Sequence, residues 1–275
     1  MRLLHTESFE LEWFPENGVP PYAIVSHTSD WDEVLFSDMS SGLSWGVSSK
    51  KGFQKIAQCA RMAKASYNLE WLWIDCCCID RESEEEFEEA VNFTFMWYQQ
   101  ATVCFVYLSD VIVRPASSFE LDAADAKWFT RGWTLQELIA PRNLEFYSGD
   151  WTYMGEKSEH LEVLKRITGV PRTVLENGNF DGFSVAQRMS WAAWRETSVP
   201  EDIAYCLVGL FELKCKFICQ SGEGASKAMH RLQEEIFEHS EEQSIFAWKT
   251  DTCDPSIYRS LFADSPAEFK DCGDI

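Results

Sequence analysis

Short apolar runs alternate with amphipathic segments through the first half of the chain. Residues 53–67 repeat apolar side chains at helical spacing, and Ser83 with Glu86 is a capping-box signature for another helix. Nearly continuous apolar runs predict four buried strands at residues 22–26, 71–75, 102–108 and 144–147. We expect residues 109–127 to form a loop that leads to a helix around Trp133. Strands separated by helices predict an α/β fold, a parallel sheet with helices on both faces.

The second half of the chain has a different, mostly helical pattern. Apolar spacing predicts helices at about residues 184–195, 201–212 and 225–238. The last residues are polar and contain Pro255 and Pro266. We therefore expect three parts: an α/β core over residues 1–150, a helical extension over 151–250, and a loose tail or linker over 251–275.

The charge of the chain narrows the range of partners. The formal net charge is −21, which argues against nucleic acid or an anionic membrane as the main partner. A small anionic ligand needs only a local cluster of donors and remains open. The amino-terminal residues lack the apolar core of a signal peptide, and no apolar run is long enough to span a bilayer. We expect a cytoplasmic protein.

The ten cysteines predict reduced thiols that are used as small apolar side chains. Cys76, Cys77 and Cys78 are adjacent in a predicted strand, so they cannot all face one metal ion. The chain has no C-x-x-C pair to complete a zinc site. The sequence therefore predicts no metal site.

The segment from Arg131 to Pro141 is the strongest candidate for chemistry. On a helix, Leu135, Leu138 and Ile139 form an apolar stripe, and Trp133 and Glu137 lie together on the opposite side. A surface glutamate alone is usually silent. Here an aromatic ring, the cation of Arg131 and the amides at the helix start could hold an anionic, aromatic ligand beside the carboxylate of Glu137.

Polar residues that follow the predicted strands form a second candidate region. Ligands of parallel sheets bind beyond the carboxyl ends of the strands, which places residues 26–28 and 75–80 at one rim with the loop before Arg131. Ser26 and His27 point to opposite faces, so they cannot form a nucleophile–base pair. Residues Ser26, His27 and Thr28 either contact a ligand or cap the strand end. Asp80 fits a structural role, and the role of Asp75 stays open.

These segments also carry a family resemblance. Residues 22–28, 73–80 and 131–141 resemble the three motif blocks of the fungal heterokaryon-incompatibility (HET) domain. Further segments, at 189–192, 201–207, 231–235 and 244–248, resemble the longer form found at the amino terminus of fungal NOD-like receptors. Ser29 stands where that family usually has Trp.

The resemblance implies an effector of programmed cell death after fusion of incompatible hyphae. It also implies a remote relation to TIR domains and hence a flavodoxin-like fold. In enzymatic TIR domains a glutamate on a similar helix supports cleavage of the nicotinamide–ribose bond of NAD. Carried over, Glu137 is the catalytic residue and NAD the substrate. The residues expected to contact it are Ser26, His27, Thr28, Asp75, Arg131 and Trp133.

Two alternatives come from other functional classes. The chain could be a non-catalytic signalling module that triggers death by self-association, in which case Trp133 and Glu137 are interface or packing residues. It could also bind a nucleotide without cleaving it. With or without catalysis, the expected partners are further copies of the chain, NAD or a related nucleotide, and receptor domains downstream in a longer chain.

Overall fold

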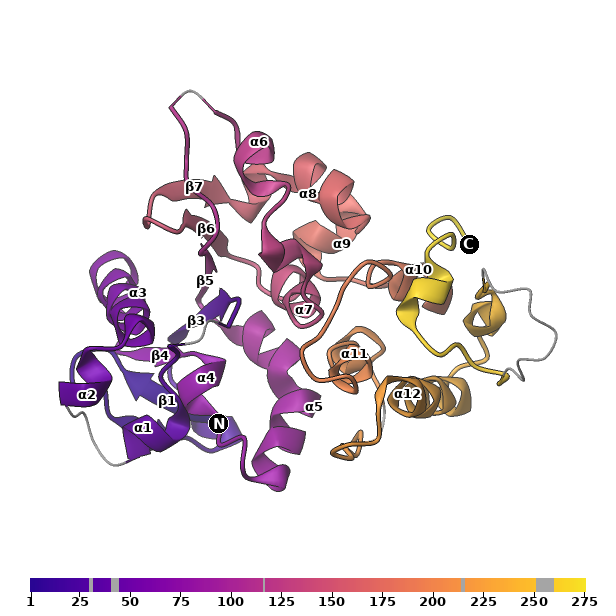
Figure 1. Ribbon diagram of the computed structural model, residues 1–275, viewed down its shortest axis with the longest axis horizontal. Helices are drawn as coiled ribbons and strands as arrows, with labels where there is room; N and C mark the ends of the chain where they lie inside the picture. Colours follow the sequence, from indigo (N-terminus) through magenta and orange to yellow (C-terminus); the bar gives the residue numbers. More distant parts are fainter. Residues whose placement is uncertain (30–31, 41–44, 116, 214–215, 251–259) are drawn as a thin grey trace. The chain divides into compact units, whose positions relative to one another are not determined.

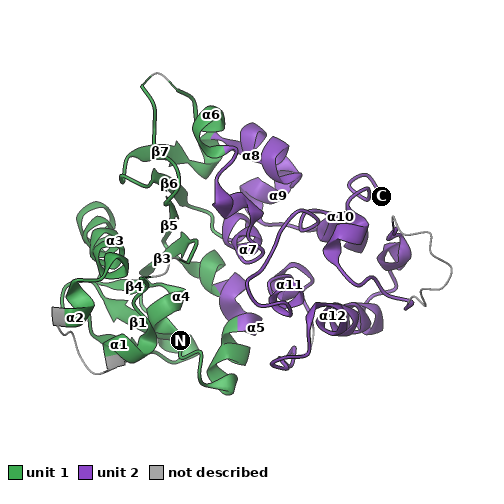
Figure 2. Ribbon diagram, viewed as in Figure 1, with its two compact units in different colours: residues 1–90, 97–123, 141–159 green, residues 91–96, 124–140, 160–275 purple. Residues whose placement is uncertain are grey.

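The computed structural model describes residues 1–29, 32–40, 45–115, 117–213, 216–250 and 260–275. The chain divides into two compact units, coloured separately in Figure 2. Unit 1 contains residues 1–90, 97–123 and 141–159, and unit 2 contains residues 91–96, 124–140 and 160–275. The predicted core of residues 1–150 therefore differs from unit 1, because the Trp133 segment belongs to unit 2.

Unit 1 contains a seven-stranded mixed sheet with the strand order β2-β1-β4-β3-β5-β6-β7 (Figure 1). The strands are β1 (Arg2–His5), β2 (Leu11–Trp13), β3 (Tyr22–His27), β4 (Trp71–Trp73), β5 (Val103–Leu108), β6 (Leu144–Ser148) and β7 (Tyr153–Glu156). The four central strands are parallel, and β1, β2 and β7 are antiparallel additions at the edges. The predicted α/β fold is confirmed.

The central strands follow the order β4-β3-β5-β6, which is the order of flavodoxin-type sheets. The chain leaves β3 toward β4 on one side and then returns to place β5 on the other side. This reversal makes the carboxyl ends of β3 and β5 the topological switch point of the sheet. Ligands of doubly wound folds bind at that position.

Helices of unit 1 lie on both faces of the sheet. On one face, the ring of Tyr67 in α3 (Lys51–Tyr67) lies 6.1 Å from that of Phe105 in β5. On the other, the ring of Trp97 in α5 (Glu84–Gln100) lies 5.7 Å from that of Trp73 in β4. The remaining helices of this unit are α1 (Phe36–Ser40), α2 (Trp45–Ser48), α4 (Asp75–Cys78) and α6 (Phe119–Ala123).

Two local predictions in unit 1 are corrected. The strand predicted over 71–75 ends at Trp73, and Asp75–Cys78 forms a single helical turn instead, with the Cys78 amide bonded to the Ile74 carbonyl. A short apolar run is compatible with a strand and with a buried helical turn. Tertiary contacts therefore determine which of the two forms. The segment predicted as a loop over 109–127 contains helix α6.

The predicted capping box of α5 is half formed. The Ser83 side chain accepts a hydrogen bond from the Glu86 amide, as a cap should. The Glu86 carboxylate, however, pairs with Arg2 at 2.6 Å instead of returning to the Ser83 amide. A charged partner from β1 is a stronger hydrogen-bond donor than a neutral amide.

Unit 2 is built from short helices. They are α7 (Thr134–Ile139), α8 (Leu161–Thr168), α9 (Arg172–Asn177), α10 (Val185–Ser190), α11 (Asp202–Tyr205) and α12 (Ala225–His239). The predicted helix at 225–238 matches α12. Those at 184–195 and 201–212 are shorter than expected, since α10 ends at Ser190 and α11 is one turn followed by a 3-10 turn. In that turn, Gly209 packs so closely on Phe95 that an added Cβ would lie 2.4 Å from it.

The described part of the expected tail, residues 260–275, packs within unit 2. Phe269 is fully buried, and the buried side chain of Gln233 donates to the Ala263 carbonyl at 2.8 Å. Residues 251–259 lie outside the described residues. Among the helices that the structure describes, none combines the length and apolar character that crossing a membrane requires.

Candidate functional site

His27 ends β3 at the switch point of the sheet, opposite Tyr107 of β5. Consecutive residues of a strand face opposite sides, and Phe105 and Tyr107 share one face, so His27 lies on the face that α3 covers. Ser26 lies on the other face and is fully buried. Thr28, just beyond the strand, is partly exposed.

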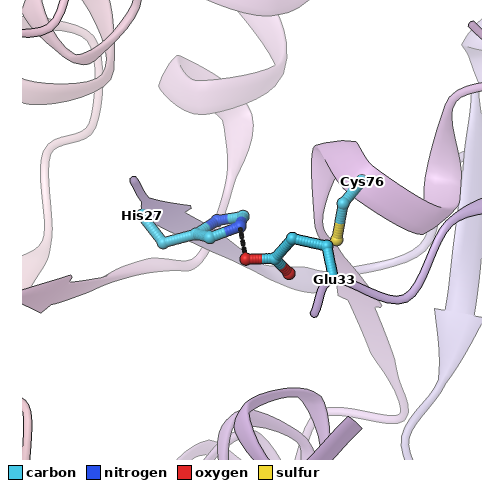
Figure 3. Close-up of side chains that lie close together, drawn as sticks. All are labelled: His27, Glu33 and Cys76. Carbon is cyan, nitrogen blue, oxygen red and sulfur yellow. Dashed lines mark ion pairs between the residues drawn. The ribbon is translucent and has the colours of Figure 1, made fainter. Parts of the chain in front are cut away.

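The imidazole of His27 lies between two carboxylates. Its Nε2 is 3.4 Å from Glu33 Oε1, and its Nδ1 is 3.8 Å from Asp75 Oδ1 (Figure 3 shows the first of these pairs). Burial and the charge of Lys55 act to lower the pKa of His27. Hydrogen bonding to Cys76 and Glu33 and the charge of Asp75 outweigh them and raise the pKa to about 10.

Glu33 and Lys55 form a buried ion pair beside this histidine. Lys55 Nζ lies 2.5 Å from Glu33 Oε1, and the two side chains are 8% and 7% exposed. Burial alone would raise the pKa of Glu33. The contacts with His27 and Lys55 reverse that effect and lower the pKa to about 2. Glu33 is therefore a carboxylate held in its charged form away from water.

Cys76 adds a thiol to the same cluster. Its Sγ, a ring nitrogen of His27 and a carboxylate oxygen of Glu33 all lie within 4.8 Å of one another. A hydrogen bond from Cys77 lowers the pKa of Cys76 to about 7, helped by His27 and opposed by burial. All cysteines in the described part of the chain are free thiols, as the sequence predicts.

Asp75 and Asp80 have separate surroundings. Asp75 is 28% exposed and accepts a hydrogen bond from Arg81 Nη2 at 2.8 Å. The Asp80 side chain accepts the amide of Glu82 at 3.0 Å, the local backbone contact that a structural aspartate in a loop makes. Asp75 therefore contacts both the exposed Arg81 and the buried His27, whereas the Asp80 side chain stabilises its own turn.

Sequence reasoning missed Glu33, Lys55 and Cys76 as members of this cluster. Glu33 lies in the segment after β3, where no periodic pattern applies. Lys55 did leave a signal, because it occupies the same helical stripe as the buried residues Cys59 and Ala63. A charged residue in an apolar stripe indicates a buried partner.

In unit 2, Glu137 differs from the other residues of helix α7 in its burial. Five of the six residues of α7 are buried, and Glu137 is only partly so. The predicted apolar stripe of Leu135, Leu138 and Ile139 is buried. Trp133 is also partly exposed, and its indole nitrogen donates to Asp202 Oδ2 at 2.9 Å.

Two arginines lie at the start of α7. Arg195 is buried, and its Nη1 donates to the Arg131 carbonyl at 2.6 Å and to Thr134 Oγ1 at 2.9 Å. Burial lowers the pKa of Arg195 to about 10, an effect that the charges of Cys206 and Glu137 oppose. The Arg131 side chain is 31% exposed and donates to Ser198 at 2.6 Å. No pattern in the sequence indicates the role of Arg195.

The structure thus assigns the predicted site residues to two groups. Ser26, His27, Thr28 and Asp75 belong to unit 1, and Arg131, Trp133 and Glu137 belong to unit 2. Within the first group, His27 and Asp75 are in contact. Within the second, Arg131, Trp133 and Glu137 are all partly exposed.

Two comparisons relate this chain to known proteins. The family model described as heterokaryon incompatibility protein (HET) matches residues 22–114, a span that contains the whole His27 cluster. Vegetative incompatibility protein HET-E-1 of Podospora anserina is 41% identical over an alignment of 229 residues, and the match covers 81% of this chain. The chain contains a heterokaryon incompatibility (HET) domain. It spans only 16% of the length of that relative. No solved structure gives a significant match.

Proposed function

We propose that this HET-domain chain is a cell-death effector in heterokaryon incompatibility, and that it cleaves the nicotinamide–ribose bond of NAD with Glu137 as the catalytic carboxylate. The name of the relative from Podospora anserina supports the incompatibility role. One observation carries the catalytic part: in a helix whose other five residues are buried, Glu137 alone retains exposure. The five buried side chains anchor α7 in the core. The side chain of Glu137 therefore keeps surface that a ligand can contact.

The reaction suits a single carboxylate. As the bond breaks, positive charge builds on the ribose, much as in glycoside hydrolysis. A carboxylate held near the ribose stabilises that charge in the transition state. Nicotinamide leaves as a neutral molecule, so the step requires no general acid.

The residues around Glu137 have complementary roles in this proposal. Arg131 is partly exposed and would pair with a phosphate of NAD. Trp133 would form an aromatic wall, and its ring is held by the hydrogen bond to Asp202. Buried Arg195 fixes the backbone at the start of α7 through the Arg131 carbonyl and so supports both.

A separate part of the proposal concerns unit 1, where Ser26, His27, Thr28 and Asp75 contact a nucleotide. Their place at the switch point of a flavodoxin-type sheet supports it, since ligands bind there in this class of fold. Ser26 and His27 are buried, so Thr28 and Asp75 are the members with surface to offer a ligand.

The experiment joins the chain to an inducible dimerisation domain and measures free nicotinamide after incubation with NAD. We expect release to start when the inducer clusters the protein, because the proposal makes activity depend on self-association. The same fusion without inducer is the control. Intact NAD in forced oligomers would contradict catalysis.

A second candidate is a non-catalytic module that signals by self-association. Trp194 is 79% exposed, and Val199 in the same segment is also exposed. Exposed tryptophan is typical of protein interfaces. If this candidate holds, Trp194→Asp prevents oligomer formation in light scattering, and forced oligomers of the unchanged chain leave NAD intact.

A further inference from the structure

We propose that His27, Glu33 and Cys76 bind a thiophilic divalent cation, with Zn²⁺ as the best match. The three residues come from the end of β3, the segment that follows it, and α4. Their ligand atoms lie within 4.8 Å of one another, and Figure 3 shows the three side chains converging. The inference does not depend on cleavage of NAD.

The distances suit a tetrahedral centre. Two nitrogen or oxygen ligands at about 2.0–2.1 Å from zinc are about 3.3 Å apart. His27 Nε2 and Glu33 Oε1 are already 3.4 Å apart. The thiolate edges of such a centre measure about 3.6 Å, so the distance from Cys76 Sγ to each of the other two ligand atoms has to shorten by about 1.2 Å at most.

The donor set selects the metal. Imidazole, carboxylate and thiolate are all ligands of zinc, whereas magnesium and calcium prefer oxygen alone. The carboxylate and the thiolate together carry two negative charges, which Zn²⁺ cancels. All three side chains are buried, so a bound ion would lose most of its hydration water and be coordinated by these protein ligands instead. Three protein ligands leave a fourth position for water, the pattern of a catalytic zinc.

Asp75 supplies the second interaction that zinc-binding histidines have. Such a histidine donates its other ring N–H to a carboxylate, which fixes the tautomer and the direction of the ring. Here His27 Nδ1 lies 3.8 Å from Asp75 Oδ1, and its Nε2 is directed at Glu33. Arg81 in turn holds Asp75 at 2.8 Å. Asp75 is therefore placed to accept the His27 N–H once their separation shortens from 3.8 Å to hydrogen-bond distance.

Lys55 opposes the metal. Its ammonium lies 2.5 Å from Glu33 Oε1 and competes for the carboxylate that the ion requires. Two unit charges at this separation interact strongly even in a partly polar interior. Removing the charge of Lys55 should therefore strengthen metal binding. If Glu33 and Lys55 were only a structural ion pair, the same change would give no such gain.

The test titrates metal-stripped protein with Co²⁺, a spectroscopic probe for zinc sites, and then with Zn²⁺ in a calorimeter. We expect one ion per chain, the visible bands of tetrahedral cobalt, and a thiolate-to-cobalt charge-transfer band. Zn²⁺ should displace Co²⁺. Absence of saturable one-to-one binding in the unchanged protein would overturn the proposal, and this measurement needs no variant to fold.

Variants then identify the ligands. Cys76→Ser should remove the charge-transfer band, whereas Cys78→Ser should keep it, because Cys78 Sγ is directed at the Leu72 carbonyl. Asp75→Asn should weaken Zn²⁺ binding about 10- to 100-fold. Lys55→Met should tighten it about tenfold or more. A charge-transfer band that survives in folded Cys76→Ser protein, or weaker binding in folded Lys55→Met protein, would contradict the site.

Discussion

Trp133 donates its indole N–H to the carboxylate of Asp202 at 2.9 Å, across 69 positions of sequence. This bond joins the residue that precedes α7 to the start of α11. The acceptor Asp202 is buried, whereas the donor Trp133 is partly exposed. The helical part of the chain therefore determines how the tryptophan beside Glu137 is oriented.

Loss of this bond should have a measurable cost. Asp202→Ala leaves the indole N–H without its acceptor, and we expect the free energy of unfolding to fall by about 1–3 kcal/mol. Urea unfolding followed by circular dichroism measures it. Asp274→Ala, at an exposed position near the end of the chain, is the matched control and should change stability by less than about 0.5 kcal/mol. Equal stabilities of the two variants would contradict the importance of the bond.

The buried pair of Glu33 and Lys55 should matter far more than an exposed pair. Glu33→Gln leaves the Lys55 ammonium buried without its carboxylate, and we expect metal-stripped protein to lose about 3–5 kcal/mol of stability. Asp38→Asn breaks the Asp38–Lys50 pair, whose side chains are 24% and 28% exposed, and should cost no more than about 1 kcal/mol. Parallel denaturant titrations compare them. Similar losses in both variants would mean that solvent reaches the Glu33 cluster.

Gly132 should tolerate no side chain. A Cβ there would lie 2.6 Å from Thr197 Cγ2 and 2.9 Å from Cys206 Sγ, both within unit 2. We expect Gly132→Ala to destabilise the protein by about 1–3 kcal/mol through overpacking. Gly273→Ala is the control, since nothing lies within 4 Å of an added Cβ at that position. Thermal unfolding of both variants tests this prediction. An unchanged unfolding midpoint for Gly132→Ala would contradict the close contact.

Lys157 should make stability depend on pH. Burial lowers its pKa from 10.5 to about 8, and its ammonium donates to the Pro141 carbonyl. Between pH 8 and 10.5 the unfolded chain binds the proton that the folded chain has lost, so stability rises with pH in this window. Below pH 8 both states are protonated and the contribution is constant.

The comparison with Lys157→Met isolates this group from other titrations. Relative to that variant, the unchanged protein should gain up to about 3 kcal/mol between pH 7 and pH 10.5. Urea unfolding at several pH values measures the difference. A difference that stays constant with pH would show that the lysine is not desolvated.

The sequence predicts some parts of this fold well. The strands β3 and β5 are continuous apolar runs that are buried on both faces, and such runs are the clearest signal of a parallel sheet. The antiparallel strands β1 and β7 have four residues each and little alternation, so no local pattern identifies them. The turn at Asp75–Cys78 has the composition of a strand, and only its surroundings make it helical.

The candidate site divides in the same way. His27 and Asp75 follow strands and can be placed at the rim from sequence alone. Their contact with Glu33, Lys55 and Cys76 depends on how a loop and two helices pack, which no spacing rule describes. Asp202 and Arg195 act on the α7 region from about 60–70 residues away, so the helix sequence itself gives no sign of them.

The substitution Glu137→Gln tests whether Glu137 is the catalytic residue. This change keeps the shape of the side chain and removes its charge. The measurement is the rate of nicotinamide release from NAD by clustered protein, with Glu176→Gln, at an exposed position of α9 in the same unit, as the control. Our account predicts a fall of about a hundredfold or more for Glu137→Gln and none for Glu176→Gln. Unchanged release by a folded, clustered Glu137→Gln protein would contradict it.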